Sequence, residues 1–286
     1  MNSYYQLDTD EYSFYLIIIK GDGIDNISIG GRKAAAACVN ISVSRPDSLM
    51  VQRGFHKLDS ATIPVLAWDS KCAINKDLEK GTGTITMINI LLSEVCKRYP
   101  YVNTYSFYDN SLIRCDNGKQ ISLLHLSVIE HNKSWYERHF NAYILNKEVN
   151  ENYKNGIMAL NSPDVKESFD TFKKIIYPSK ASGIDSLKLY YESSSTYHDF
   201  FISILEKEGK KGLCNMIVGW IDIFLLYIFR CNPLSVEWAI NKESISLQEV
   251  TEIRLINKPA QSGGRRYTKK NIPKVLRVNI NDSYYT

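Results

Sequence analysis

The sequence has no long uninterrupted apolar run. The longest apolar stretch, from Met216 to Phe229, is interrupted by Asp222. It falls short of the roughly 20 residues that a membrane-spanning helix needs. The acidic start of the chain also lacks the basic segment and small-residue cleavage site of a signal peptide. We therefore expect no membrane span and a cytoplasmic location.

Closely spaced cysteines are also missing. The six cysteines stand at positions 38, 72, 96, 115, 214 and 231 and never form C-x-x-C, which excludes the usual ligand pairs of a zinc site. His131 and His139 are eight residues apart and have no third close ligand, so we expect no metal. The simplest interpretation of the cysteines is reduced thiols in a cytosolic-type compartment.

Several common site motifs are absent as well. The chain contains neither the Walker pattern G-x-x-x-x-G-K-[ST] nor the hydrolase pattern G-x-S-x-G. Thr86 and Met87 stand where a dinucleotide-binding G-x-G-x-x-G would place its third glycine. The net charge of +4 is too small to indicate a nucleic-acid binder by itself.

What the sequence does contain is an alternation of strands and helices. Strand patterns occupy 12–20, 39–44, 62–67, 104–108 and 142–145, whereas 21–31 is rich in glycine and turns. A helical stripe of Ile88, Leu91, Leu92, Val95 and Tyr99 ends before Pro100. A second helix is predicted over 121–139. This order predicts an α/β fold, with a mixed sheet flanked by helices.

The character of the chain changes after Val149. A polar, turn-rich segment follows, and helical periodicity then dominates 164–176 and 196–229, which predicts a boundary between 1–149 and a mostly helical region, 150–286. The 216–229 segment is apolar on nearly every side, so it is buried either in a core or against a partner. A basic cluster near the end consists of Arg265, Arg266, Lys269 and Lys270. This cluster is interpreted either as a solvated loop or as a contact for phosphate or nucleic acid, with Tyr267 available to stack on a base.

The stretch K-G-T-G-T, residues 80–84, comes immediately before the first long helix. A helix N-terminus carries free backbone N–H groups and a partial positive charge, and glycine lets a phosphate approach them closely. Gly81 and Gly83 are therefore interpreted either as a phosphate-binding loop or as a tight turn.

The order TIPVLA strand, K-G-T-G-T, helix, TYSFY strand, helix and WYERHFNAYI resembles the core of the GNAT superfamily of N-acetyltransferases, over residues 12–146. The resemblance implies acetyl-CoA as cofactor, its pantetheine bonded to a strand. It implies that the pyrophosphate is bound by Lys80, Gly81, Thr82, Gly83 and Thr84. It also implies Tyr136 as general acid for the departing thiolate, with Asn141 replacing a glycine. Leu78 and Ala142 depart from the pattern, which has Gln or Arg at the first position and Phe at the second.

For the general base we expect Asp69, which follows the TIPVLA strand and would lie near the thioester. The leading functional hypothesis is thus acetyl transfer to an unidentified amine. The chain is also similar to uncharacterised acetyltransferase-like proteins of large nucleocytoplasmic DNA viruses, which implies host cytoplasm or virion as its location.

Two alternatives remain open. The first is a non-catalytic viral structural or interaction protein on a decayed acetyltransferase fold, with a partner or virion contact through the Met216–Phe229 helix. The second is a nucleic-acid-binding module that uses the basic cluster.

Overall fold

A nine-stranded mixed sheet forms the centre of the computed structural model, which describes residues 2–32, 38–179, 183–246 and 250–257. The strand order is β11-β1-β2-β3-β4-β5-β6-β10-β9. Every neighbouring pair is antiparallel except β5 and β6, which are parallel. The strands are β1 (Asn2–Asp8), β2 (Ser13–Lys20), β3 (Ile24–Gly30), β4 (Val39–Ser44), β5 (Ser60–Leu66), β6 (Thr104–Tyr108), β9 (Tyr143–Ile144), β10 (Glu237–Asn241) and β11 (Glu252–Leu255). β7 (Leu112–Arg114) and β8 (Gln120–Ser122) form a separate hairpin.

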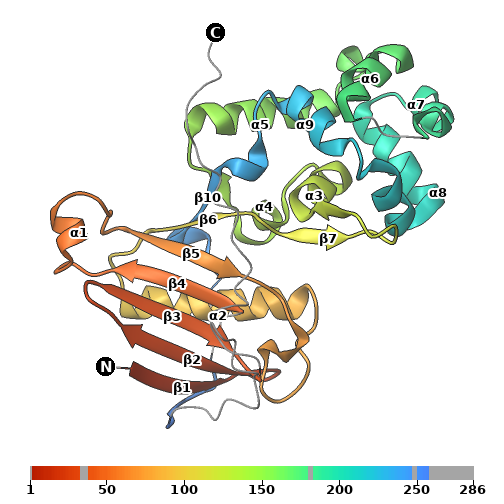
Figure 1. Cartoon of the computed structure of the whole chain (residues 1–286). Coiled ribbons are helices and arrows are strands. Elements are labelled where there is room, and N and C mark those ends of the chain that lie inside the picture. The colour runs from red at the N-terminus through yellow and green to blue at the C-terminus, as the bar shows by residue number, and fades with distance from the viewer. Residues whose placement is uncertain (1, 33–37, 180–182, 247–249, 258–286) are drawn as a thin grey trace, which may run out of the picture.

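The long helix α2 (Thr82–Arg98) lies across one face of this sheet (Figure 1). Alternate residues of β2, such as Phe14 and Leu16, are fully buried, as expected for a strand with one face on a core. The apolar stripe predicted for the helix is buried too, and the helix ends at Arg98, with Tyr99 as its C-cap residue. The predicted α/β class, with its helix and its β2, β4, β5 and β6 strands, is confirmed.

Two local predictions are wrong. The glycine-rich segment 21–31 holds β3, because only its first residues make the turn: Gly21 N–H bonds Ile24 O, and Gly23 has a φ of +77°. The predicted helix 121–139 is broken into β8, α3 (Leu123–His131) and α4 (Trp135–Phe140). The break follows from Asn132, which is left-handed with a φ of +58°, and from Ser134, whose capping box with Glu137 starts a new helix.

The region after residue 149 is mostly helical, as predicted, and lies beside the sheet (Figure 1). Its core is aromatic: the Phe172 ring lies 5.3 Å from Trp220 and 5.6 Å from Phe224. The predicted boundary at 149 nevertheless does not separate the sheet from the region that follows it. β10 and β11 come after this boundary, yet β10 inserts between β6 and β9, and β11 pairs with β1. The helices are α5 (Lys147–Leu160), α6 (Phe169–Ile176), α7 (Lys188–Glu192), α8 (Tyr197–Ile217) and α9 (Ile221–Phe229), and the short α1 (Leu49–Gln52) lies in the sheet half.

The apolar segment 216–229 is not one helix. α8 ends at Ile217, α9 begins at Ile221, and the two axes are bent by 87°. Trp220, Phe224 and Ile228 are at most 8% exposed, so the chain itself covers the face on which the partner hypothesis depended. Within the described residues no single helix has the length and apolarity to cross a membrane; α8 and α9 meet that test only as a bent pair.

The cysteines give a further correction. Two disulfides are present, Cys38–Cys72 and Cys115–Cys214, whereas Cys96 and Cys231 are free thiols. The partners are 34 and 99 residues apart, and such distant pairing leaves no local signal in the sequence. The expectation of six reduced thiols is therefore wrong. Disulfides persist in oxidising surroundings. The cysteines therefore do not support a cytoplasmic location, which stays a prediction.

Candidate functional site

The parallel strands β5 and β6 separate soon after they begin. Three residues of β5, Ser60 to Thr62, pair with Thr104 to Ser106, and no further pair joins the two strands. On its other side β5 pairs with β4, and the register shifts by one residue around Pro64. Proline has no N–H and suits such an irregularity. Among the described residues, the end of β5 therefore keeps a β4 neighbour on one side and has no strand neighbour on the side towards β6.

The helix that connects these strands begins without a side-chain cap. Gly81 is the N-cap residue of α2, with a φ of +90°, and a Cβ built there would meet nothing within 4 Å. Because a β-α-β crossover runs its helix antiparallel to the strands, this N-terminus lies at the edge where β5 and β6 separate. Its unbonded N–H groups and partial positive charge favour an anion.

The two glycines of the motif have different surroundings. Gly83 lies inside the first turn of α2, where an added Cβ would come within 3.0–3.1 Å of Leu78 and of the Tyr12 hydroxyl. Leu78 is itself buried beneath it, which explains why an apolar residue stands at this position. Thr82 donates its hydroxyl hydrogen bond to Glu79, at 2.7 Å. Of the two glycines, only Gly81 therefore has open space around it.

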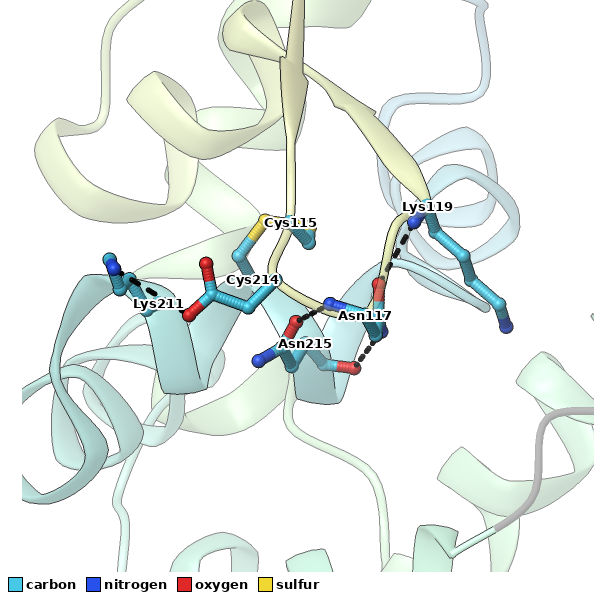
Figure 2. The surroundings of a disulfide bond; sticks show 7 residues. Cys115, Asn117, Lys119, Lys211, Cys214 and Asn215 are labelled. Atoms are coloured by element: carbon cyan, nitrogen blue, oxygen red, sulfur yellow. Dashed lines mark hydrogen bonds and ion pairs between the residues drawn. A yellow bond between two sulfur atoms is a disulfide. The ribbon is translucent and has the colours of Figure 1, made fainter.

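A cavity of about 550 Å³ begins beside this helix start, at Lys80. The hairpin β7–β8, helices α3 and α4, and helix α8 enclose it, and the Cys115–Cys214 disulfide is part of its wall. Figure 2 shows this disulfide joining the hairpin to α8, with Asn117 bonded to Asn215 beside it. The charged side chains lining the cavity are Lys80, Arg114, Asp116, Glu130, Arg138, Lys210 and Lys211.

The expected general acid, Tyr136, lies in the core and does not line this cavity. Its side chain is 3% exposed, and its ring packs 4.6 Å from that of Phe107 in β6. Burial and the nearby Asp109 carboxylate raise the pKa of Tyr136 well above its usual value, although a hydrogen bond with Ser111 opposes the shift. The hydroxyl is therefore held in its protonated form. Asn141 is left-handed, with a φ of +49°, as the replacement of a glycine requires.

The expected general base, Asp69, has a structural role instead. Its carboxylate accepts a hydrogen bond from the backbone N–H of Lys71, at 2.9 Å, and so caps the 3-10 turn Ser70–Cys72. Asp69 does not line the cavity. The carboxylate therefore stabilises the loop between β5 and α2, and its role as general base stays a prediction.

A different carboxyl group, Asp109, was missed by the sequence analysis. It directly follows β6 and is 3% exposed, and its Oδ1 accepts hydrogen bonds from the Ser111 backbone N–H, at 3.0 Å, and from the Ser111 hydroxyl. Its Oδ2 has no hydrogen-bond partner among the described residues. Burial raises the pKa of Asp109 above the usual carboxyl value. The only sequence signal was an acidic residue at the end of an alternating strand.

A buried histidine lies near this carboxyl group. His125 is 2% exposed, its Nδ1 lies 2.8 Å from Asp222 Oδ1, and its charge lowers the pKa of Asp109 in opposition to burial. The hydrogen bond with His125 lowers the pKa of Asp222. The Asp222 side chain is 70% exposed, so this pair runs from the buried His125 of α3 to the surface at α9, and neither residue lines the cavity beside Lys80.

Neither a metal site among the described residues nor a known relative was found that bears on this site. In the part of the chain that the structure describes, no group of three His, Cys, Asp or Glu side chains could hold a metal ion. The basic cluster of Arg265, Arg266, Lys269 and Lys270 lies outside the described residues. No family model, curated protein or solved structure matches the chain.

Proposed function

We propose that this protein binds acetyl-CoA and transfers its acetyl group to an amine. One observation carries the proposal: β5 and β6 separate after three paired residues, and the uncapped start of α2 lies at the same edge. The motif at 80–84, which suggested this cofactor in the sequence, belongs to that edge.

The proposed site divides the cofactor between two backbone features. Pantetheine is an extended chain with two amides, so it can bond the β6-facing side of β5 in the manner of an added strand. The pyrophosphate then lies on the N–H groups that follow Gly81, with the Lys80 ammonium beside it. Gly83 and Thr84 contribute to this arrangement through the backbone of the first helical turn.

The proposed chemistry needs one proton to be removed and another to be supplied. The amine nitrogen attacks the thioester carbonyl, the C–N bond forms, the C–S bond breaks, and the thiolate takes a proton. Tyr136 is the acid that the resemblance implies; its hydroxyl carries the proton to be supplied, and its raised pKa makes it a weak donor. Asp109, linked to Tyr136 through Ser111, takes the role of general base from Asp69 in our proposal and accepts the proton that the amine nitrogen loses.

A binding protein without catalysis is the second proposal, and a specific observation favours it. Tyr136 is buried away from the cavity, and Asp69 is committed to a cap. The two proposals differ in whether CoA thiol is released from acetyl-CoA in the presence of amines such as a lysine peptide or a polyamine. Release that is lowered about 100-fold by Tyr136→Phe, with acetyl-CoA affinity unchanged, supports the enzyme; binding without release supports the second proposal.

The test of cofactor binding compares two glycines. Gly81 and Gly54 both have a positive φ and open space for a side chain, but Gly54 follows α1, outside the proposed site. We expect calorimetry to show acetyl-CoA binding to the wild type, a loss of at least tenfold in Gly81→Asp through charge repulsion, and wild-type affinity in Gly54→Asp. Absence of binding to the wild type, or equal affinities in the two variants, would contradict the proposal.

A further inference from the structure

The cavity beside Lys80 combines a strong positive charge with an apolar surface. Five lysine or arginine side chains line it, against two carboxylates. The two carboxylates are already paired: Glu130 lies 2.7 Å from Lys210, and Asp116 lies 3.7 Å from Lys211. An excess of positive charge therefore faces the space that these residues enclose.

Three of the cations have no carboxylate partner among the described residues. Within the described residues, Lys80, Arg114 and Arg138 make no ion pair. Arg114 comes from β7, Arg138 from α4, and Lys80 from the loop before α2. Guanidinium groups bind phosphate oxygens in a bidentate manner, so two of them on opposite elements suit a ligand with more than one phosphate.

The remaining lining favours a flat apolar group beside the phosphates. Trp135 is half-buried at the cavity, and Leu123 and Leu126 line it together with the two disulfide-bonded cysteines. An indole ring provides a stacking surface for a base. A volume of about 550 Å³ lies within the range of small-molecule sites. A single inorganic anion would leave most of this apolar lining uncovered.

From these observations we infer that the cavity enclosed by α3, α4, α8 and the β7–β8 hairpin binds a nucleotide with two or more phosphates. The residues that recognise the phosphates are Lys80, Arg114 and Arg138, and Trp135 recognises the base. The inference shares Lys80 with the proposed function, but it requires neither pantetheine nor acetyl transfer. Lys210 and Lys211 lie beyond the segment that resembles an acetyltransferase, so the C-terminal region contributes one wall.

The disulfide makes this site dependent on redox state. Arg114 immediately precedes Cys115, and Lys210 and Lys211 lie one turn before Cys214 on α8. The Cys115–Cys214 bond therefore fixes the hairpin cation relative to the helix cations (Figure 2). Without it, the described ties between the hairpin tip and α8 are the two Asn117–Asn215 hydrogen bonds and the Asp116–Lys211 ion pair, which is 3.7 Å long. These contacts are weaker than a covalent bond, so we expect nucleotide affinity to fall.

The experiment is calorimetry on the oxidised full chain, with ADP, inorganic pyrophosphate and adenosine as probes. We expect ADP to bind at least tenfold more tightly than either of the other two. The Arg114→Gln/Arg138→Gln variant should lose at least tenfold in ADP affinity. Lys119→Gln is the matched control, because Lys119 lies on the same hairpin but does not line the cavity, and it should bind ADP as the wild type does.

A second comparison tests whether the Cys115–Cys214 disulfide contributes to ADP binding. Cys115→Ser/Cys214→Ser should weaken ADP binding at least fivefold, whereas Cys38→Ser/Cys72→Ser, which removes the disulfide outside the cavity, should not. Circular dichroism checks that each variant is folded. If the Cys115→Ser/Cys214→Ser variant does not fold, the Arg114→Gln/Arg138→Gln variant tests the inference. The inference is overturned if the wild type does not bind ADP at millimolar concentration, if pyrophosphate binds as tightly as ADP, or if the arginine variant retains full affinity. If ADP binds and acetyl-CoA binds no more tightly than ADP, the proposed function is refuted and this inference is not.

Discussion

The part of the protein around the nine-stranded sheet (the sheet half) and the mostly helical region after residue 149 (the helical half) build their cores in different ways. The sheet half uses aliphatic residues in alternation, such as Ile27 and Ile29 of β3, and β3 packs against α2. The helical half packs aromatic rings from three helices, with Phe172, Phe200 and Trp220 in mutual contact. Alternation is legible in a sequence, because it is local, whereas an aromatic cluster forms only when distant helices meet. The cavity with its excess of positive charge lies where the two halves join.

The largest expected effect concerns the two disulfides. Cys115–Cys214 closes a loop of 99 residues and links the halves, whereas Cys38–Cys72 closes 34 residues within the sheet half. Chain entropy predicts a loss of about 5 kcal/mol in the free energy of unfolding for Cys115→Ser/Cys214→Ser, and about 4 kcal/mol for Cys38→Ser/Cys72→Ser. Urea unfolding of the oxidised proteins measures both values. A larger loss at the 34-residue loop would reverse the order that we expect.

The next largest effect tests whether the chain itself covers α9. Phe224 is fully buried in the aromatic cluster, whereas Leu226, two residues away, is 50% exposed. Phe224→Ala should lower the free energy of unfolding by about 3–5 kcal/mol, and Leu226→Ala should change it by less than about 0.5 kcal/mol. Thermal or urea unfolding of the purified protein gives both numbers. Similar small losses would mean that a partner, and not this chain, covers the helix.

A smaller effect, and one that depends on pH, is expected at Asp109 in the sheet half. Burial raises the folded-state pKa of this carboxyl group above its unfolded value. The folded state therefore binds the proton more tightly, and the wild type loses stability as pH rises from the unfolded pKa through the folded one. Asp109→Asn removes this loss, so the variant should gain stability relative to the wild type between pH 4 and pH 7. Urea unfolding at the two pH values checks the sign, and a variant that becomes relatively less stable at pH 7 would show that the ionised carboxylate is stabilised.

The elements that the sequence revealed are those whose signal is local. α2 has a complete apolar stripe, and β2 has regular alternation. β10 went unrecognised because it is defined by pairing with a distant strand, Trp238 opposite Phe107 and Ala239 opposite Ser106. β3 was hidden because a glycine turn begins its segment.

The candidate site shows the same difference between local signals and contacts between distant segments. Lys80 and Gly81 form one motif, so the sequence located that part of the edge. Arg114, Arg138 and Lys210 come from three segments and each is unremarkable alone, so only the fold brings them around one cavity. Asp69 was chosen for its position after the TIPVLA strand and Tyr136 by resemblance, and the structure places the first in a cap and the second in the core.

Hydrogen–deuterium exchange with and without acetyl-CoA tests the central proposal most directly. The first backbone N–H groups of a helix have no intrahelical partner and exchange quickly, so a ligand bound to them gives clear protection. We predict protection at 82–84 and at 65–66, and none at the start of α5, which Asn146 already caps. Protection confined to other segments, or none at saturating acetyl-CoA, would contradict the account.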